Sequence, residues 1–262
     1  MESTKKRIEE IKNNGYELDF SDVFNHAFEN YKKIALYAGL ALFVFLVLMG
    51  IIVAGIAVSV MGMAVLNEKF IENLKLENLS GVYVILYLIV AVFFSALLSP
   101  FNAGFLKMAY SAEKDEEFHV STFFEYFKVP YFKELFTATI LISLVSSGLS
   151  ILLELANIQI LGLLTSMAVS FLTVLTLPLI IFGELKAIDA IQSSFTIVIK
   201  QPVTLILLIV VAYIGSYVGL IGCCIGMFFT VPFIYSTQYA IYCAIVGIDS
   251  KTELEEIGSD ME

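Results

Sequence analysis

Side chains that commonly carry out chemistry are few in this sequence. Its two histidines, His26 and His119, have no second ligand at the spacing that metal sites use. The cysteines Cys223, Cys224 and Cys243 all lie within apolar stretches, where packing is the expected role. The sequence contains no H-E-x-x-H, G-x-S-x-G or phosphate-binding loop motif. We therefore expect no catalytic, metal-binding or cofactor-binding residue.

Charged residues inside membrane helices usually mark a proton or ion pathway, and the long apolar stretches of this chain contain almost none. Lys107, Glu154 and Glu184 fall at the predicted ends of these stretches, where their charges can reach water. This pattern counts against ion-coupled transport by embedded carboxylates. A passive or lipid-handling role is compatible with it.

Polar residues gather beside three prolines, Pro100, Pro178 and Pro232, each in the second arm of a predicted hairpin. A proline leaves one backbone carbonyl of a membrane helix without its hydrogen bond, and nearby hydroxyl groups can bond to it. The structural interpretation is therefore that these side chains provide the hydrogen bonds that the prolines remove from the helices. The functional alternative is a polar cavity between the three second arms that holds a lipid headgroup or a small molecule. Its candidate residues are Asn102, Thr176, Tyr235, Gln238 and Tyr239.

The elements that must position these residues are membrane-spanning helices. Hydrophobic residues make up 59% of the 262 residues and charged residues 15%, whereas soluble domains are about 45–50% apolar. We predict an all-α polytopic membrane protein with one domain over residues 18–247, between a polar tail at 1–17 and an acidic tail at 248–262. Its six transmembrane helices are expected to form three hairpins, with spans at about 34–66, 82–105, 135–153, 160–182, 202–220 and 225–246.

An amphipathic segment precedes each predicted hairpin, and the three segments resemble one another. Shifting the first by 100 residues aligns Phe24 with Phe124, and a further 67 residues brings the third into register. Lys33, Lys133 and Lys200 then fall in one column. We interpret the three as an internal repeat of one unit, an interfacial amphipathic helix followed by two spans. Each lysine would anchor its unit at the headgroups. Chance similarity between apolar segments is the alternative.

The distribution of lysine and arginine predicts the orientation. The residues up to Lys33 carry six of these bases, the segment from 107 to 133 four, the segment from 186 to 200 two, and the C-terminal tail one. The loops on the opposite side carry two together. The positive-inside rule therefore places both termini in the cytoplasm, and we expect a multi-pass protein of the bacterial inner membrane.

Glycines and helix length give two further expectations. Gly215, Gly219, Gly222 and Gly226 cross the turn between the fifth and sixth spans, which favours tight helix packing over a ligand-binding loop. The uncharged stretch 34–66 is too long for one bilayer crossing, because its helix would reach ~50 Å against a hydrocarbon core of ~30 Å. We expect one continuous helix that extends beyond the outer face, after an amphipathic segment capped by Ser21.

One phrase supports a family resemblance. Asp189 to Phe195 reads DAIQSSF, and Lys200, Gln201 and Pro202 follow it at the entry to a hairpin. Together with the order of segments over residues 18–247, this phrase resembles bacterial six-helix membrane proteins similar to the membrane domain attached to some glycerophosphoryl diester phosphodiesterases. The resemblance implies a six-helix membrane fold. It implies no catalytic residues, because the phosphodiesterase chemistry belongs to a separate soluble domain.

These observations lead to two functional hypotheses. The first is a non-enzymatic accessory or scaffolding subunit of an inner-membrane complex, with membrane lipids and other integral membrane proteins as its partners and no nucleic acid or cofactor. The second is a protein that binds or transports a lipid or small molecule in the polar cavity beside the prolines. A membrane-embedded enzyme would need titratable groups to cluster around His26, Lys107 or Glu184.

Overall fold

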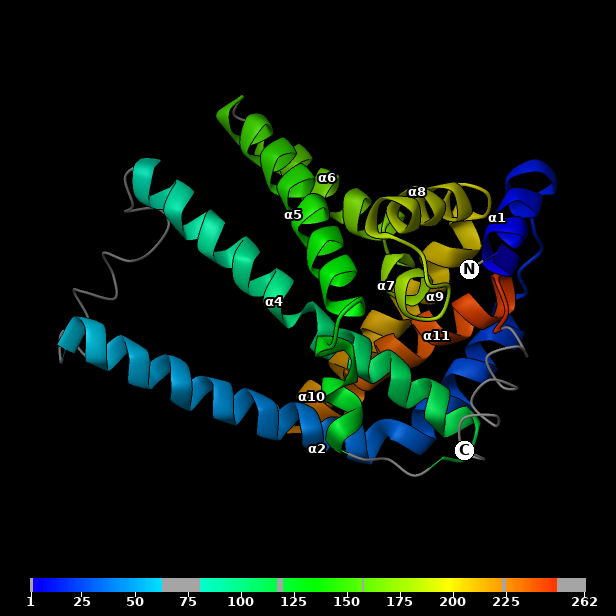
Figure 1. The fold of residues 1–262 in the computed structure, drawn as a ribbon, viewed down its shortest axis with the longest axis horizontal. Helices are drawn as coiled ribbons and strands as arrows, with labels where there is room; N and C mark the ends of the chain where they lie inside the picture. Colours follow the sequence, from blue (N-terminus) through cyan, green and yellow to red (C-terminus); the bar gives the residue numbers. More distant parts are fainter. Residues whose placement is uncertain (1, 63–80, 117–119, 157, 223–224, 249–262) are drawn as a thin grey trace.

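A computed structural model describes residues 2–62, 81–116, 120–156, 158–222 and 225–248. Within these ranges every regular element is a helix (Figure 1). Five stretches are long and apolar enough to cross a membrane, namely Phe20–Ser59, Ile85–Glu113, Tyr131–Leu153, Ile160–Ile181 and Pro202–Ile221. The α-helical polytopic class is confirmed at this level, but six spans are not. His119, Cys223, Cys224 and residues 249–262 lie outside the described residues.

The longest helix, α2, spans Phe20–Met61 and joins the first amphipathic segment to the first predicted span. Its N-cap is Asp19, whose carboxylate accepts a hydrogen bond from the backbone N–H of Asp22 at 2.9 Å; the expected cap, Ser21, is already inside the helix. The 42 residues correspond to a length of about 63 Å. The helix continues through Gly50 and Gly55, and the predicted end at residues 63–66 lies outside the described residues.

Helix α4 (Gly81–Glu113) is longer than the second predicted span, because it continues past residue 105 as far as Glu113. The second amphipathic segment forms a short 3-10 helix, η3 (Val120–Phe127), and the chain then passes through a cis Val129–Pro130 bond into α5 (Tyr131–Leu155). Gly104 lets η3 lie directly on α4, since a Cβ there would come within 2.8 Å of the Cα of Phe123.

Helices α5 and α6 (Gln159–Leu172) form an antiparallel hairpin. The hydroxyl groups of Ser150 and Ser166 lie 2.6 Å apart across it, and the Ser150 hydroxyl also donates to the carbonyl of Gly162 at 3.2 Å. The predicted fourth span is not one helix: α6 ends at Leu172, and α7 (Thr176–Ile181) begins after a short turn.

The predicted sixth span, 225–246, is also divided. Helix α9 (Pro202–Val218) and the 3-10 turn η4 (Gly219–Gly222) lead to α10 (Ile225–Thr230), and α11 (Pro232–Ile245) follows it. Pro232 stands at the first turn of α11, where its missing N–H removes no helical bond. Nine residues of α11 are buried, including Tyr239 and Tyr242. This segment is therefore a central packing element of the core, and it is not among the five candidate spans.

The N-terminal residues are not a detached tail. Helix α1 (Glu2–Asn14) buries Ile11 completely and packs against α8 (Ala187–Val198), the third amphipathic segment. The guanidinium of Arg7 donates to the carbonyl of Ile245 at the end of α11, at 3.1 Å. Residues 2–14, which the sequence assigned to a polar tail, therefore form a helix that contacts the predicted domain.

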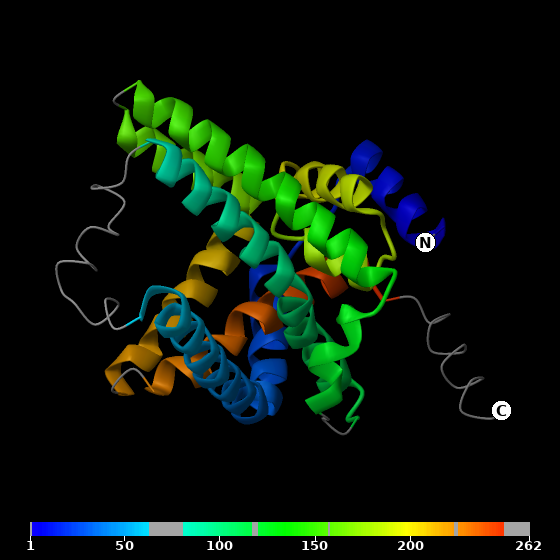
Figure 2. The same ribbon diagram turned by 60° about the vertical axis from the view of Figure 1, so that its left-hand side comes forward.

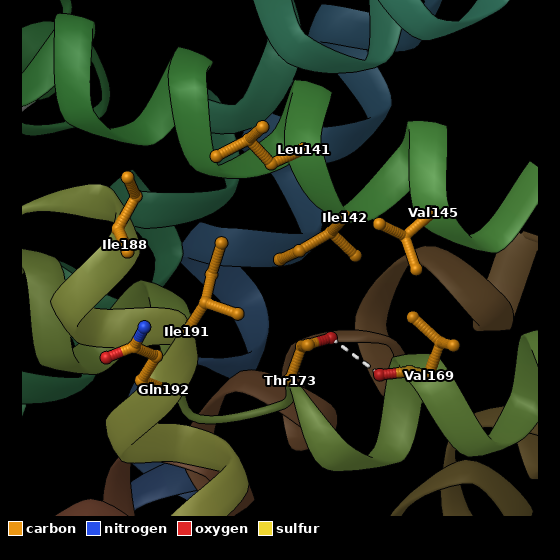
Figure 3. A pocket seen from close by; sticks show the side chains of 8 residues that line it. All are labelled: Leu141, Ile142, Val145, Val169, Thr173, Ile188, Ile191 and Gln192. Carbon is orange, nitrogen blue, oxygen red and sulfur yellow. Dashed lines mark hydrogen bonds between the residues drawn. The ribbon is translucent and has the colours of Figure 1, made fainter.

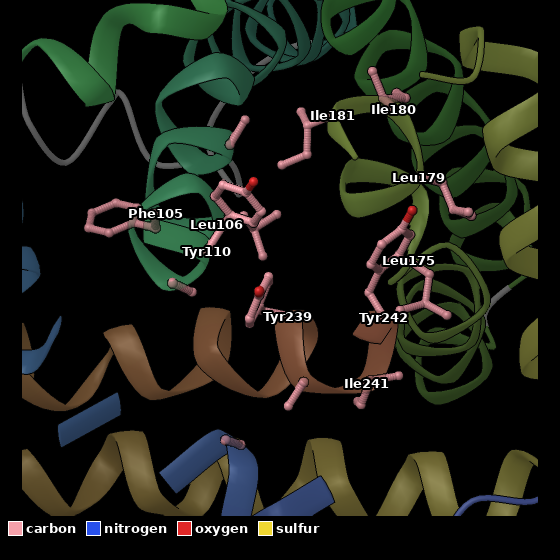
Figure 4. Packing of buried hydrophobic residues seen from close by; sticks show 14 of the residues in the cluster. Phe105, Leu106, Tyr110, Leu175, Leu179, Ile180, Ile181, Tyr239, Ile241 and Tyr242 are labelled. Carbon is pink, nitrogen blue, oxygen red and sulfur yellow. The ribbon is translucent and has the colours of Figure 1, made fainter. Parts of the chain in front are cut away.

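The apolar arms diverge from a common centre. The outer half of α2, the first half of α4 and the α5–α6 hairpin extend in different directions in Figure 1, and Figure 2 shows the outer half of α2 apart from the other two. None of the most apolar 18-residue window of α2 is buried. Burial is instead concentrated where α11 meets α2, α4 and α7, around Phe105, Tyr239 and Tyr242 (Figure 4).

The three lysines of the predicted repeat occupy different local settings. Lys33 lies within α2, Lys133 lies in the first turn of α5, and Lys200 follows α8 just before α9. The three amphipathic segments are likewise part of a long helix, a 3-10 helix and a separate α-helix. The structure does not confirm three equivalent units, because equivalent sequence positions have different backbone conformations.

Candidate functional site

A polar cluster joins α2, α4 and α11 at the buried centre. The Asn30 side chain is only 4% exposed and makes two hydrogen bonds. Its amide donates to the carbonyl of Ala109 at 2.6 Å, and its oxygen accepts from the hydroxyl of Ser236 at 2.9 Å. Asn30 thus links one helix of the core to two others.

His26 lies one turn before Asn30 on the same helix. Its Nε2 atom is 2.9 Å from Oε2 of Glu113, the last residue of α4. The ring also meets the buried Tyr239 edge-on, with 6.1 Å between ring centroids. The sequence analysis found no metal-ligand partner for His26 and did not pair it with Glu113, which is 87 positions away. The contact requires α4 to continue beyond its apolar stretch.

Lys33 makes further contacts between α2 and the end of α4. Its ammonium group donates to the carbonyl of Ala112 at 2.9 Å and to the carboxylate of Asp115 at 2.7 Å. The predicted role of Lys33 was headgroup anchoring, and these contacts add a direct link to the C-terminal end of α4. Together, Asn30, His26 and Lys33 fasten one face of α2 to the last turns of α4.

The residues predicted to line a polar cavity occupy several places. The hydroxyl of Tyr235 donates to Asn102 across α11 and α4 at 2.9 Å, and its ring stacks on Phe105. Tyr239 meets His26, as described above, and also meets Phe182 edge-on. The half-buried Gln238 lies beside Tyr239 on α11.

Thr176 differs from these residues. It is the first residue of α7, it is fully buried, and its hydroxyl has no hydrogen-bond partner among the described residues. A buried hydroxyl without a partner is costly. Thr176 is therefore a position where the local packing leaves a polar group unsatisfied.

Hydroxyl groups donate hydrogen bonds to backbone carbonyls where the helices are interrupted. Ser99 donates to the carbonyl of Ala96 at 2.8 Å, which is the carbonyl that Pro100 leaves without an N–H. Between α9 and the end of α10, Ser216 and Thr230 exchange hydrogen bonds with each other's carbonyls at 3.2 and 2.5 Å. These contacts agree with the structural interpretation of polar residues near the prolines.

The turn between α6 and α7 is held by α8. The Ser194 hydroxyl is fully buried, donates to the carbonyl of Leu172 at 2.8 Å and accepts from the N–H of Leu175 at 3.1 Å. Its bonds satisfy one of the carbonyls left open at the end of α6 and one N–H just before α7. Nearby, the hydroxyl of the half-buried Tyr16 donates to the carbonyl of Ile197 at 3.1 Å, and partial burial raises the pKa of Tyr16 well above its usual value.

A groove lies between α5, the end of α6 and α8 (Figure 3). Its volume is about 260 Å³. The lining is apolar except for one threonine and one glutamine, and consists of Leu141, Ile142, Val145, Val169, Thr173, Ile188, Ile191 and Gln192. The Thr173 hydroxyl already donates to the carbonyl of Val169 at 2.8 Å. None of the residues predicted for the polar cavity lines this groove, which sequence reasoning missed because it combines three separate segments.

Close helix packing occurs at three of the predicted glycines, Gly215, Gly219 and Gly226. A Cβ on Gly219 would come within 2.5 Å of the backbone of Gly226, and a Cβ on Gly215 would meet the ring of Phe233 at 2.9 Å. These glycines allow α9 and η4 to approach α10 and α11. No cluster of three or more histidine, cysteine or acidic side chains that could hold a metal is present in the described residues.

Comparison with known proteins adds no identity to this geometry. No family model, no curated protein and no solved structure matches the chain. The resemblance to the membrane domain attached to some glycerophosphoryl diester phosphodiesterases stays a prediction from the sequence.

Proposed function

We propose that this protein is a non-enzymatic accessory subunit that scaffolds a complex of integral membrane proteins in the bacterial inner membrane, with both termini in the cytoplasm. The proposal rests on one observation: apolar helices extend in different directions from a core that hydrogen bonds hold together. The most apolar window of α2 has no buried residue, whereas Asn30 and Ser236 at its base are almost fully buried. Exposed apolar helices that are fixed to a well-packed core can hold partner helices in a defined arrangement.

The outer half of α2 also has the residue types that membrane helices use for close packing. Gly50 and Gly55 lie on this arm, and a Cβ at either position would meet nothing within 4 Å. In lipid, helices associate through van der Waals contact and small residues rather than through the hydrophobic effect. The open space beside a glycine on an exposed helix leaves room for the backbone of another helix.

The alternative, a polar cavity beside the prolines, has less support. Tyr235 bonds to Asn102, and Ser236, on the same helix, bonds to Asn30. These polar groups satisfy one another, so they do not need a ligand as a hydrogen-bond partner.

The test is purification of the tagged full-length protein from its native membrane in mild detergent. The wild-type chain should retain a partner in constant stoichiometry. Gly55→Leu should lose that partner, because leucine fills the space that a second helix would need. We place the partner contact on the α2 arm, so Gly148→Leu is the matched control: this glycine is equally open but lies on α5, and the partner should remain. A wild-type particle that is monomeric and without a partner would contradict the proposal.

A further inference from the structure

The groove between α5, α6 and α8 has two candidate membrane spans and one short helix as its walls. Two of its walls belong to the candidate spans Tyr131–Leu153 and Ile160–Ile181. The third wall, α8, has 12 residues and is too short to cross a bilayer. It nevertheless exposes Ile188, Phe195 and its C-cap residue Ile199 by about half of their surface. A short helix with an exposed apolar face beside two spans is expected to lie in the membrane interface.

Polar contacts at both sides hold the groove in shape. At one side, the carboxylate of Glu134 in the first turn of α5 accepts a hydrogen bond from the N–H of Ala187, the first residue of α8, at 2.8 Å. At the other side, Ser194 fixes α8 to the turn after α6 through its bonds to Leu172 and Leu175. These bonds set the position of α8 relative to α5 and α6 without a contribution from the groove's own apolar side chains.

The lining selects the chemistry of an occupant. Six of the eight lining residues are aliphatic, and the Thr173 hydroxyl is engaged with Val169, so the groove offers a polar or charged molecule few partners. The volume of about 260 Å³ is below the range of about 300–1,000 Å³ for drug-sized ligands. A partner helix, about 10 Å across with its side chains, is too wide. A single hydrocarbon chain fits both the polarity and the size.

We propose that this groove binds one acyl chain of a membrane phospholipid. The chain lies against Ile142, Val169 and Ile191, and the headgroup end lies at the exposed amide of Gln192. Exposed lysines flank α8 at its two ends, Lys186 and Lys200, and Asp189 between them pairs with Lys5 at 3.2 Å. This site is separate from the arm of α2 that the scaffold proposal assigns to a partner.

Native mass spectrometry of the full-length protein tests the site. The protein is reconstituted in vesicles of phosphatidylethanolamine and phosphatidylglycerol and extracted in mild detergent. One retained phospholipid per chain is expected. Val169→Phe should fill the groove and reduce retention about tenfold, the change that a loss of about 1.4 kcal/mol of binding produces. Leu164→Phe, on an exposed position of α6 outside the lining, is the control and should leave retention unchanged.

A photo-crosslinking amino acid at Gln192 gives an independent readout in intact vesicles, and it does not depend on a groove-filling substitution. A covalent adduct with the mass of a phospholipid is expected. The proposal is overturned if the adduct is a peptide of this chain or of another protein. It is also overturned if Val169→Phe and Leu164→Phe retain lipid equally while both variants show the wild-type helical circular dichroism spectrum.

Discussion

Replacing Asn30 by alanine is the substitution that most directly tests how the buried centre is held together. The Asn30 amide bonds to Ala109 at 2.6 Å and its oxygen bonds to Ser236 at 2.9 Å, with 4% of the residue exposed. The variant loses both bonds and leaves the Ser236 hydroxyl and the Ala109 carbonyl each short of one partner in a buried position. Water cannot replace these bonds without entering the core.

The expected magnitude follows from these contacts. Each hydrogen bond contributes about 0.5–1.5 kcal/mol net, and a buried group left without its partner costs about 1–3 kcal/mol. Part of that cost is recovered because the Ser236 hydroxyl can turn toward a helix carbonyl. We therefore expect Asn30→Ala to lower the free energy of unfolding by about 2–4 kcal/mol. In a double-mutant cycle, Asn30→Ala and Ser236→Ala should show a coupling energy of about 0.5–1.5 kcal/mol.

The assay is reversible unfolding of the purified protein in mixed detergent micelles, followed by circular dichroism for the wild type, both single variants and the double variant. Asn25→Ala is the matched control, because Asn25 is exposed on the same helix and should change the free energy by less than about 0.5 kcal/mol. Effects of the two buried substitutions that add within about 0.3 kcal/mol would refute the direct contact.

Three further substitutions test packing, all by the same unfolding assay. Thr176→Val removes a buried hydroxyl that has no partner among the described residues, so it should leave stability unchanged or raise it by about 1 kcal/mol; a clear loss would show that the hydroxyl has a partner. Ser194→Ala should lower stability by about 2–3 kcal/mol, because the N–H of Leu175 loses its acceptor. A loss below about 0.5 kcal/mol would show that the turn does not depend on this hydroxyl. Gly219→Ala places a Cβ 2.5 Å from the facing backbone and should cost about 1–3 kcal/mol, whereas Gly148→Ala, in open space, should be neutral or slightly stabilising. Equal effects of the two glycine substitutions would contradict the close approach.

Hydrophobicity made the membrane class and most helix positions predictable. Uncharged stretches of sufficient length have no alternative to helix in a bilayer, because every backbone polar group must be bonded within its own segment. Ser99 beside Pro100 was also open to sequence reasoning, since the carbonyl that a proline frees is fixed by helix geometry. The helix boundaries were less predictable, as the continuation of α4 to Glu113 shows.

Most of the candidate site could not be predicted from the sequence. The polarity of Asn30 favours the solvated face of its helix, yet its position falls in the buried stripe with Val23, Ala27 and Ile34. Its partner Ser236 is 206 positions away, and no local pattern reports such a contact. The lipid groove depends in the same way on three segments that meet only in the fold.

The sequence by itself determined that this chain is an apolar, helical membrane protein, because hydrophobicity and helix periodicity are local properties of the chain. The tertiary structure decided which apolar helices become buried. The segment 225–246 looked like a sixth span, but it breaks before Pro232, and α11 packs at the centre of the core. The physical reason is that apolar side chains are equally stable against lipid and against protein. Long-range bonds such as those of Asn30 and Ser194 therefore select the arrangement, and residues far apart in sequence make them.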